Sequence, residues 1–165
     1  MRINFYISGK ERDKFMSSCE AVISNVGNAT KAGTTQACEE ILADSLVQVP
    51  RDTDTLASTG FYEVSRRMAT KRYTYEGIVG YAGGTGAGAS RDRLNPKSGA
   101  MASEYATRVH EDLKAWHLNG GKAKFLEDPV RDYGRARFKR VAETHWRYAI
   151  IKSNAGGDSY IPTSL

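Results

Sequence analysis

A long amphipathic segment near the start of the chain constrains the fold more than any other feature. Over residues 10–48, apolar residues recur every three or four positions, which is the period of an α-helix with one buried face. The stripe comprises Phe15, Cys19, Val22, Val26, Ala29, Gly33, Ala37 and Ile41, and is extended by Leu42, Leu46 and Val49. Each glycine in a helix costs about 1 kcal/mol relative to alanine. The pattern therefore predicts either one long helix or two helices broken near Gly27–Gly33. Ser8 and Glu11 form a possible capping box at its start, and Pro50 ends it.

Patterns typical of β structure follow this helix. Apolar and polar residues alternate in Phe61–Ser65 and Tyr73–Tyr81, and more weakly in Tyr105–Glu111. Three such strands predict an antiparallel meander with one face covered by helix. A final amphipathic helix is predicted from about Phe125 to Ile150, and a short strand or extended arm at Arg2–Ile7. The predicted class is α+β, with a long N-terminal helix and a C-terminal helix packed on a small antiparallel β-meander.

The chain is predicted to form a single domain over residues 1–150, followed by an extended tail at 151–165. Its 165 residues are enough to bury a core. Residues 82–102 are rich in Gly, Ser and Ala and have no periodic apolar set. A loop of this length is unusual inside a compact domain. We therefore expect residues 82–102 to be flexible in the free protein and to become ordered on contact with a partner.

The net charge of +5 comes entirely from the second half of the chain. Residues 1–82 contain 10 Lys/Arg and 10 Asp/Glu, whereas residues 83–165 contain 14 and 9. A basic stripe at a spacing of four (Arg131, Arg135, Lys139) could face phosphate, but acidic residues are interleaved with it. A solvated helix face is the simpler interpretation, and a basic DNA-binding accessory protein is the alternative that the charge leaves open.

The motifs that could indicate chemistry are weak. Gly84–Ala89 fits a dinucleotide-binding pattern, but Pro96 and Gly99 follow it where that motif needs a helix. His110 and His117 do not have the spacing of a zinc site. No nucleophile and base can be assembled from local signatures. We therefore predict that the protein is not an enzyme and has no catalytic residues, cofactor or metal site.

Three segments together resemble one known family. Val49–Ser58 resembles a "VP-x-DTG-x-L-x-S" turn, Tyr105–Glu111 resembles a "YA-x-x-VHE" segment, and Gly121–Pro129 resembles a "G-x-A-x-FLE-x-P" segment at the start of a closing helix. All three occur, in this order, in the minor capsid and tail-completion proteins of tailed double-stranded DNA phages. The residues that carry the match are Pro50, Asp52, Thr53, Leu56, Tyr105, Val109, Phe125, Leu126 and Pro129. One position differs, because the family usually has glycine where this chain has Asp54, and the backbone of the turn could differ there.

The matched residues have natural packing roles. Pro50 would stop the first helix, Asp52 and Thr53 would close a turn through their side chains, and Leu56 would re-enter the core. Phe125, Leu126 and Pro129 would anchor the last helix on the sheet and fix its first turn. These roles favour stability and assembly over catalysis.

The resemblance implies a structural protein of the virion. Such proteins form homo-oligomeric rings at the head–tail neck, between head-completion proteins and the tail tube, and assemble in the host cytoplasm. Their partners would be copies of the same chain and neighbouring neck and tail-tube proteins, without a membrane, and DNA would only pass through the channel. The candidate assembly loop contains Gly84, Gly86, Arg91, Arg93 and Leu94.

Overall fold

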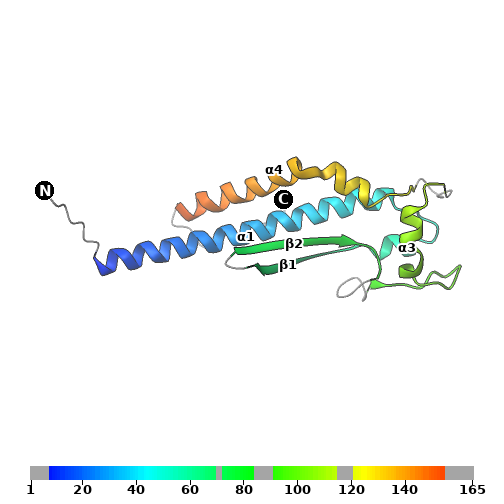
Figure 1. Ribbon diagram of the computed structural model, residues 1–165, viewed down its shortest axis with the longest axis horizontal. Helices are drawn as coiled ribbons and strands as arrows, with labels where there is room; N and C mark the ends of the chain where they lie inside the picture. The colour runs from blue at the N-terminus through cyan, green and yellow to red at the C-terminus, as the bar shows by residue number, and fades with distance from the viewer. Residues whose placement is uncertain (1–7, 70–71, 84–90, 115–120, 155–165) are drawn as a thin grey trace.

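The computed structural model describes residues 8–69, 72–83, 91–114 and 121–154. The elements are α1 (Gly9–Gln48), α2 (Thr55–Ser58), β1 (Phe61–Ala69), β2 (Arg72–Gly80), α3 (Ala102–Glu111) and α4 (Glu127–Asn154). Helix α1 lies in the middle, with the β1–β2 hairpin along one side and α4 along another (Figure 1). Helix α3 lies at the end of the molecule where α1 finishes (Figure 1). The predicted α+β class is confirmed.

Helix α1 is continuous over its 40 residues, so the alternative of two helices broken near Gly27–Gly33 is wrong. It begins at the predicted capping box, in which the Glu11 amide donates to the Ser8 hydroxyl and the Ser8 amide donates to the Glu11 carboxylate. Tertiary packing explains the absence of a break. A Cβ on Gly33 would lie 3.3 Å from the Ala142 Cα atom of α4. The glycine thus allows two helices to approach closely, which offsets its low helix propensity.

The contact between α1 and α4 is made largely by small residues. Ala29 and Ala149 are both fully buried and pack together. Polar groups complete the contact, because His145 Nε2 lies 2.8 Å from Gln36 Oε1 and the Gln36 amide donates to Glu40 at 2.8 Å. Burial lowers the pKa of His145. His145 is therefore buried in the interface between α1 and α4.

The hairpin packs on α1 through a second close approach. Its strands pair in antiparallel register, with Val64 opposite Gly77. A Cβ on Gly77 would lie 2.4 Å from Cys38 Sγ and 3.1 Å from Thr34 Cγ2. Both of these predicted strands are confirmed: β1 continues beyond Ser65 to Ala69, and β2 begins and ends one residue earlier than predicted. The described residues contain only this two-stranded sheet, so the predicted meander is wrong.

The third predicted strand, Tyr105–Glu111, is instead part of helix α3. Ala102 is fully buried, and Tyr105, Ala106 and Val109 pack against the same core cluster. Their spacing of three and four residues forms one helical face, which the weak alternation of this segment concealed. The backbone amide of Met101 donates to the Glu104 carboxylate at 2.9 Å, as at the start of a capped helix.

Helix α4 covers more of the chain than expected and packs differently. It extends to Asn154, so residues 151–154 belong to the helix and not to an extended tail. It lies mainly along α1, whereas the sequence predicted packing on the sheet. Gly134 has φ 56° and ψ 167°, which interrupts the helical backbone. This region of backbone space is essentially restricted to glycine.

Of the predicted flexible loop, the structure describes residues 82–83 and 91–102. Residues 91–102 are structured: the Gly99 amide donates to the Asn95 carbonyl at 2.8 Å, and Leu94 forms an isolated β-bridge with Met101. Residues 91–101 contain turns and one isolated β-bridge and are not part of a named helix or strand, so this part of the segment is a loop with its own hydrogen bonds, and helix α3 begins at Ala102. The predicted N-terminal arm, the glycine motif at 84–89, His117 and residues 155–165 lie outside the described residues. No described helix is both long and apolar enough to cross a membrane.

Candidate functional site

The three segments that carry the family resemblance meet at one end of the molecule. The fully buried residues there are Val49, Leu56, Ala82, Ala102 and Phe125. We call this group, with the side chains that pack on it, the motif cluster. Phe125 lies at its centre, with the ring of Tyr81 at 5.2 Å and the ring of His110 at 5.0 Å between centroids, both edge to face. Such aromatic pairs stabilise a core beyond their buried area.

Gly121 joins the third segment to the first. A Cβ at this position would lie 2.2 Å from the Pro50 Cα atom and 2.6 Å from its backbone nitrogen. The next residue, Lys122, donates its backbone amide to the Gln48 carbonyl at 3.0 Å. The carbonyls of the last turn of a helix have no partner within the helix, and this bond satisfies one of them in α1. The first glycine of the third segment is therefore required for its close contact with the end of α1.

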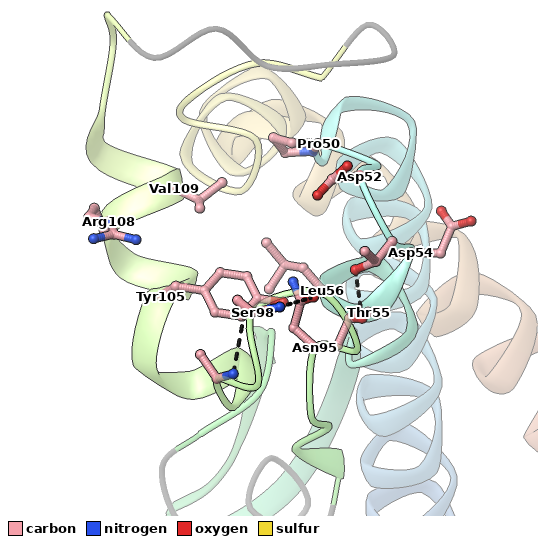
Figure 2. A pocket seen from close by; sticks show the side chains of 12 residues that line it. Pro50, Asp52, Asp54, Thr55, Leu56, Asn95, Ser98, Tyr105, Arg108 and Val109 are labelled. Carbon is pink, nitrogen blue, oxygen red and sulfur yellow. Dashed lines mark hydrogen bonds between the residues drawn. The ribbon is translucent and has the colours of Figure 1, made fainter.

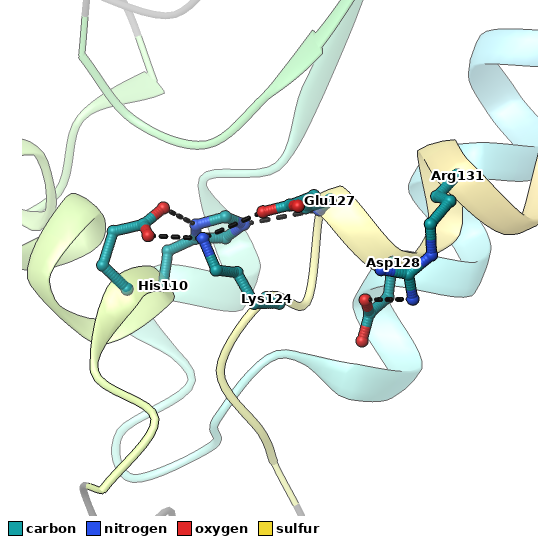
Figure 3. Close-up of polar contacts among 6 residues, drawn as sticks. His110, Lys124, Glu127, Asp128 and Arg131 are labelled. Carbon is teal, nitrogen blue, oxygen red and sulfur yellow. Dashed lines mark hydrogen bonds and ion pairs between the residues drawn. The ribbon is translucent and has the colours of Figure 1, made fainter.

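Polar contacts join the second segment to the third (Figure 3). His110 Nδ1 lies 2.7 Å from Glu111 Oε1, and His110 Nε2 accepts the Glu127 backbone amide at 3.4 Å. These two contacts fit a ring that carries a proton on Nδ1 and donates it to Glu111. The Lys124 amide donates to the His110 carbonyl at 2.8 Å, and its ammonium group pairs with both Glu111 and Glu127.

These contacts shift the pKa values of Glu111, Lys124 and Asp128. The hydrogen bond from Lys124 lowers the pKa of Glu111, and the hydrogen bonds to Glu111 and Glu127 raise the pKa of Lys124. The Asp128 carboxylate accepts hydrogen bonds from Lys122 at 2.8 Å and from Arg131 at 2.6 Å. The hydrogen bond from Lys122 lowers the pKa of Asp128. The pKa shifts of Glu111, Lys124 and Asp128 all favour the charged form, so these side chains hold the segment in place and are not tuned as proton donors or acceptors for catalysis.

A cavity of about 310 Å³ opens between the turn after α1 and helix α3 (Figure 2). Tyr105 and Val109 of α3 lie opposite Pro50 and Leu56, which gives it apolar walls. Polar side chains are at its margin, among them Asp52, Asp54, Asn95, Ser98 and Arg108. Apolar walls with a polar margin suit the side chain of another protein better than a small charged substrate.

Thr53 makes a side-chain contact within the turn, whereas Asp52 makes its ion pair outside it. The hydroxyl groups of Thr53 and Thr55 are 2.8 Å apart, as expected for a side chain that closes this turn. The Asp52 carboxylate instead pairs with Lys97 of the structured loop, and so ties that loop to the turn. Asp54 has φ 55° and ψ 0°, in the left-handed region that glycine adopts without strain and Asp tolerates. An aspartate here is compatible with the same turn that glycine would form.

Asp54→Gly and Asp54→Ala test this geometry. The glycine variant is expected to unfold with a free energy about 1 kcal/mol higher than the alanine variant, because only alanine is strained at positive φ. In an ordinary helix the order is reversed by about the same amount. Chemical denaturation of the two proteins measures the difference. Equal stability, or greater stability for Asp54→Ala, would mean that this residue does not hold the left-handed conformation.

The candidate assembly loop is only partly available for partners. Arg91 donates to the Gly60 carbonyl at 3.2 Å, and Arg93 donates from its guanidinium to the Asp92 carbonyl at 3.0 Å. These two side chains therefore contact their own chain. Leu94 is 59% exposed. Gly84 and Gly86 lie outside the described residues.

The basic stripe does not form a continuous cationic surface. The backbone break at Gly134 falls between Arg131 and Arg135, so the spacing of four does not align them as it would on one straight helix. Arg131 pairs with Asp128 and Lys139 lies 3.7 Å from Glu143. Neighbouring carboxylates reduce the positive potential that phosphate binding needs.

Comparisons with protein-family models, with curated proteins and with solved structures return no match to this chain. The described residues also contain no group of three His, Cys, Asp or Glu side chains arranged to hold a metal ion. The family resemblance therefore rests on the motif residues and on where the fold places them.

The motif cluster contains five of the nine motif residues, Leu56, Tyr105, Val109, Phe125 and Leu126. Pro50, Asp52 and Thr53 line the adjacent cavity, and Pro129 is buried in the first turn of α4. Phe125 and Pro129 are almost completely buried, and Leu126 packs on the cluster. Sequence reasoning missed Tyr81 and Lys97. The alternating pattern places Tyr81 at the end of a strand but does not predict the hydrogen bond between its hydroxyl and that of Ser45, which are 2.8 Å apart. Nothing in the sequence pairs Lys97 with Asp52, which is 45 residues away.

Proposed function

We propose that this chain is a structural subunit of a phage particle, one copy of a ring that joins or completes the head–tail neck. The observation that carries the proposal is the convergence of the three motif segments. The first segment is far from the other two in sequence, yet its Pro50 lies against Gly121 of the third segment. His110 of the second segment contacts both Phe125 and Glu127 of the third. Motifs that meet in one packed cluster act as one structural unit, which supports the interpretation of the three short segments as parts of one fold device.

The nature of the cluster also supports an assembly role. Its side chains make contacts within the chain: buried apolar groups, a close glycine contact and charge pairs that hold one segment. The cavity beside it has apolar walls and a polar margin, which fits a side chain of an adjacent subunit. A small rigid body with such a contact site is what a ring of identical subunits needs.

Deletion of the gene from the phage that encodes it tests this proposal. We expect heads and tails to accumulate unjoined, because a neck ring is required for their attachment, and we expect the wild-type gene supplied in trans to restore complete particles. Electron microscopy of the lysate shows either outcome. The Asp54→Gly variant should restore joining as well as the wild type. Complete, infectious particles without the chain would contradict the proposal.

The DNA-binding alternative is distinguished by salt. A protein that neutralises 6–10 phosphates loses roughly 10³–10⁵-fold in affinity between 50 and 200 mM salt. We expect only weak binding of duplex DNA at either salt concentration, measured by fluorescence anisotropy. Tight binding at low salt with this steep dependence would favour the DNA-binding function over the ring.

A further inference from the structure

The β1–β2 hairpin is a sheet with two open edges. Its strands, Phe61–Ala69 and Arg72–Gly80, form the only sheet in the part of the chain that the structure describes. In an antiparallel pair, every second residue of a strand directs its N–H and C=O groups away from the partner strand. No backbone hydrogen bond joins either strand to another described segment. Each edge therefore offers a row of donors and acceptors to a further strand.

The two edges lack the features that commonly prevent strands of different molecules from pairing. Natural edge strands are often very short, or contain proline, lysine or a bulge. Here each strand has nine residues, the pairing runs without interruption, and neither strand contains proline or lysine. A two-stranded hairpin is also at best marginally stable by itself, so a further strand would stabilise it. The chemistry of the hairpin thus favours an extended strand as its ligand.

The layers of the subunit allow the edges of adjacent copies to meet. Figure 1, a view along the shortest axis of the molecule, shows α1 between α4 and the hairpin, so the three layers lie in one row. Because α1 packs on a face of the sheet, the two edges point sideways out of this row. One helix is about 10 Å wide, and two strands about 4.8 Å apart also occupy about 10 Å. Copies placed side by side at this spacing bring hairpin beside hairpin and α1 beside α1, at about the 8–10 Å distance of packed helices.

We propose that β2 of one copy pairs with β1 of the next copy, so that the hairpins of a ring form one continuous antiparallel sheet. This inference rests on the proposed ring. When the strands run roughly along the ring axis, the rotation that relates neighbouring copies preserves the direction of each strand. The next β1 then runs antiparallel to β2, and the alternation within the hairpin continues between copies. The contact is head-to-tail, as a closed ring of this kind requires, and closure leaves no open edge.

The charges of the hairpin favour one register between copies. Glu63, Arg67 and Glu76 alternate with the face that packs on α1 at Gly77, so they share the opposite face. Within the hairpin Glu76 is opposite Ser65. A shift by one pleat places Glu76 of one copy opposite Arg67 of the next, whereas the reverse shift places it opposite Glu63, and like charges in that position are destabilising. Arg67 and Glu76 also pair within the chain, so the favoured register extends this pair into an alternating row of charges.

Disulfide trapping in assembled particles tests the pairing. In the favoured register Ser65 of one copy is opposite Ile78 of the next, and opposite residues lie about 4.5–5.5 Å apart between Cα atoms, within reach of a disulfide. Particles that contain the Ser65→Cys/Ile78→Cys chain should yield a ladder of covalent multimers on a non-reducing gel after mild oxidation. Ser65→Cys/Thr74→Cys is the matched control, because both pairs are diagonal neighbours within one hairpin. We expect at least about fivefold less multimer from it, since Thr74 is out of register between copies.

A mixture of single variants tests whether the contact is head-to-tail. Ser65→Cys or Ile78→Cys alone should give no covalent multimer, because a head-to-tail contact does not bring two copies of the same residue together. Particles assembled from both single variants should give covalent dimers and nothing larger, since each copy contributes one cysteine. The wild-type chain, with Cys19 and Cys38 alone, shows the background. Restoration of joined particles shows that each variant folds, and Ile78 is 48% exposed, so its replacement should be tolerated.

The outcomes separate the pairing of hairpins from the proposed neck function. Joined particles that contain the Ser65→Cys/Ile78→Cys chain but yield no covalent multimer would overturn the pairing and leave the neck function standing. Equal multimer from the two double variants, or multimers from either single variant alone, would overturn the pairing as well. Joined particles that form after deletion of the gene would remove the ring itself, and with it both proposals.

Discussion

Gly121→Ala is expected to lower the free energy of unfolding by about 4 kcal/mol, which is among the largest effects a single methyl group can have. The added Cβ would lie 2.2 Å from the Pro50 Cα atom, and the atoms it meets belong to the backbone at the end of α1. A flexible side chain could move aside, but these atoms cannot move without displacing the turn that leads to Leu56. Urea denaturation followed by circular dichroism measures the loss.

Gly27→Ala is the control for this substitution. Nothing lies within 4 Å of a Cβ on Gly27, which is in the interior of α1. Alanine there should raise the free energy of unfolding by up to about 1 kcal/mol, through helix propensity alone. A loss below 1 kcal/mol for Gly121→Ala would mean that the third motif segment is not held against Pro50, and would remove one contact on which the proposed function relies.

Gly77→Ala is expected to destabilise the protein by about 3 kcal/mol, at the upper end of the range for overpacked cores. Its Cβ would lie 2.4 Å from Cys38 Sγ and 3.1 Å from Thr34 Cγ2, so the hairpin would have to move away from α1. Nine paired residues in each strand depend on this packing, because a two-stranded hairpin alone is at best marginally stable. Thermal or urea unfolding measures the change.

A double variant shows whether the clash is with Cys38. Cys38→Ala removes the sulfur atom and on its own should cost about 1 kcal/mol through the small cavity it leaves. Combined with Gly77→Ala, it should restore about 1–2 kcal/mol relative to the sum of the single changes, which is the coupling expected for residues in contact. Additive effects would place the hairpin at a different distance from the helix than the structure has it.

Local patterns in the chain predict several elements correctly. The spacing of apolar residues predicts α1, the capping box at Ser8 predicts its first residue, and alternation predicts both strands of the hairpin. These features depend on neighbours within a few residues, so the sequence is sufficient for them. The motif residues around Pro50, Tyr105 and Phe125 could also be recognised, although only as separate short segments.

Tertiary contacts explain the elements that local patterns mispredict. The segment at Tyr105 alternates weakly enough to suggest a strand, but Ala102, Tyr105 and Val109 face one core cluster as a helix. Gly33 suggests a break in α1, but the backbone of α4 lies against it and the helix continues. In both cases packing between distant segments outweighs a local preference of about 1 kcal/mol.

The sequence of this protein therefore determines its helical and strand periodicity, its capping and its turn residues, because each depends on interactions within one or two turns of chain. Only the tertiary structure decides that Gly121 meets Pro50, that Lys97 meets Asp52 and that the first turns of α1 extend past their cover. Those contacts join residues tens of positions apart, and their free energy depends on how whole elements pack, which no local pattern encodes.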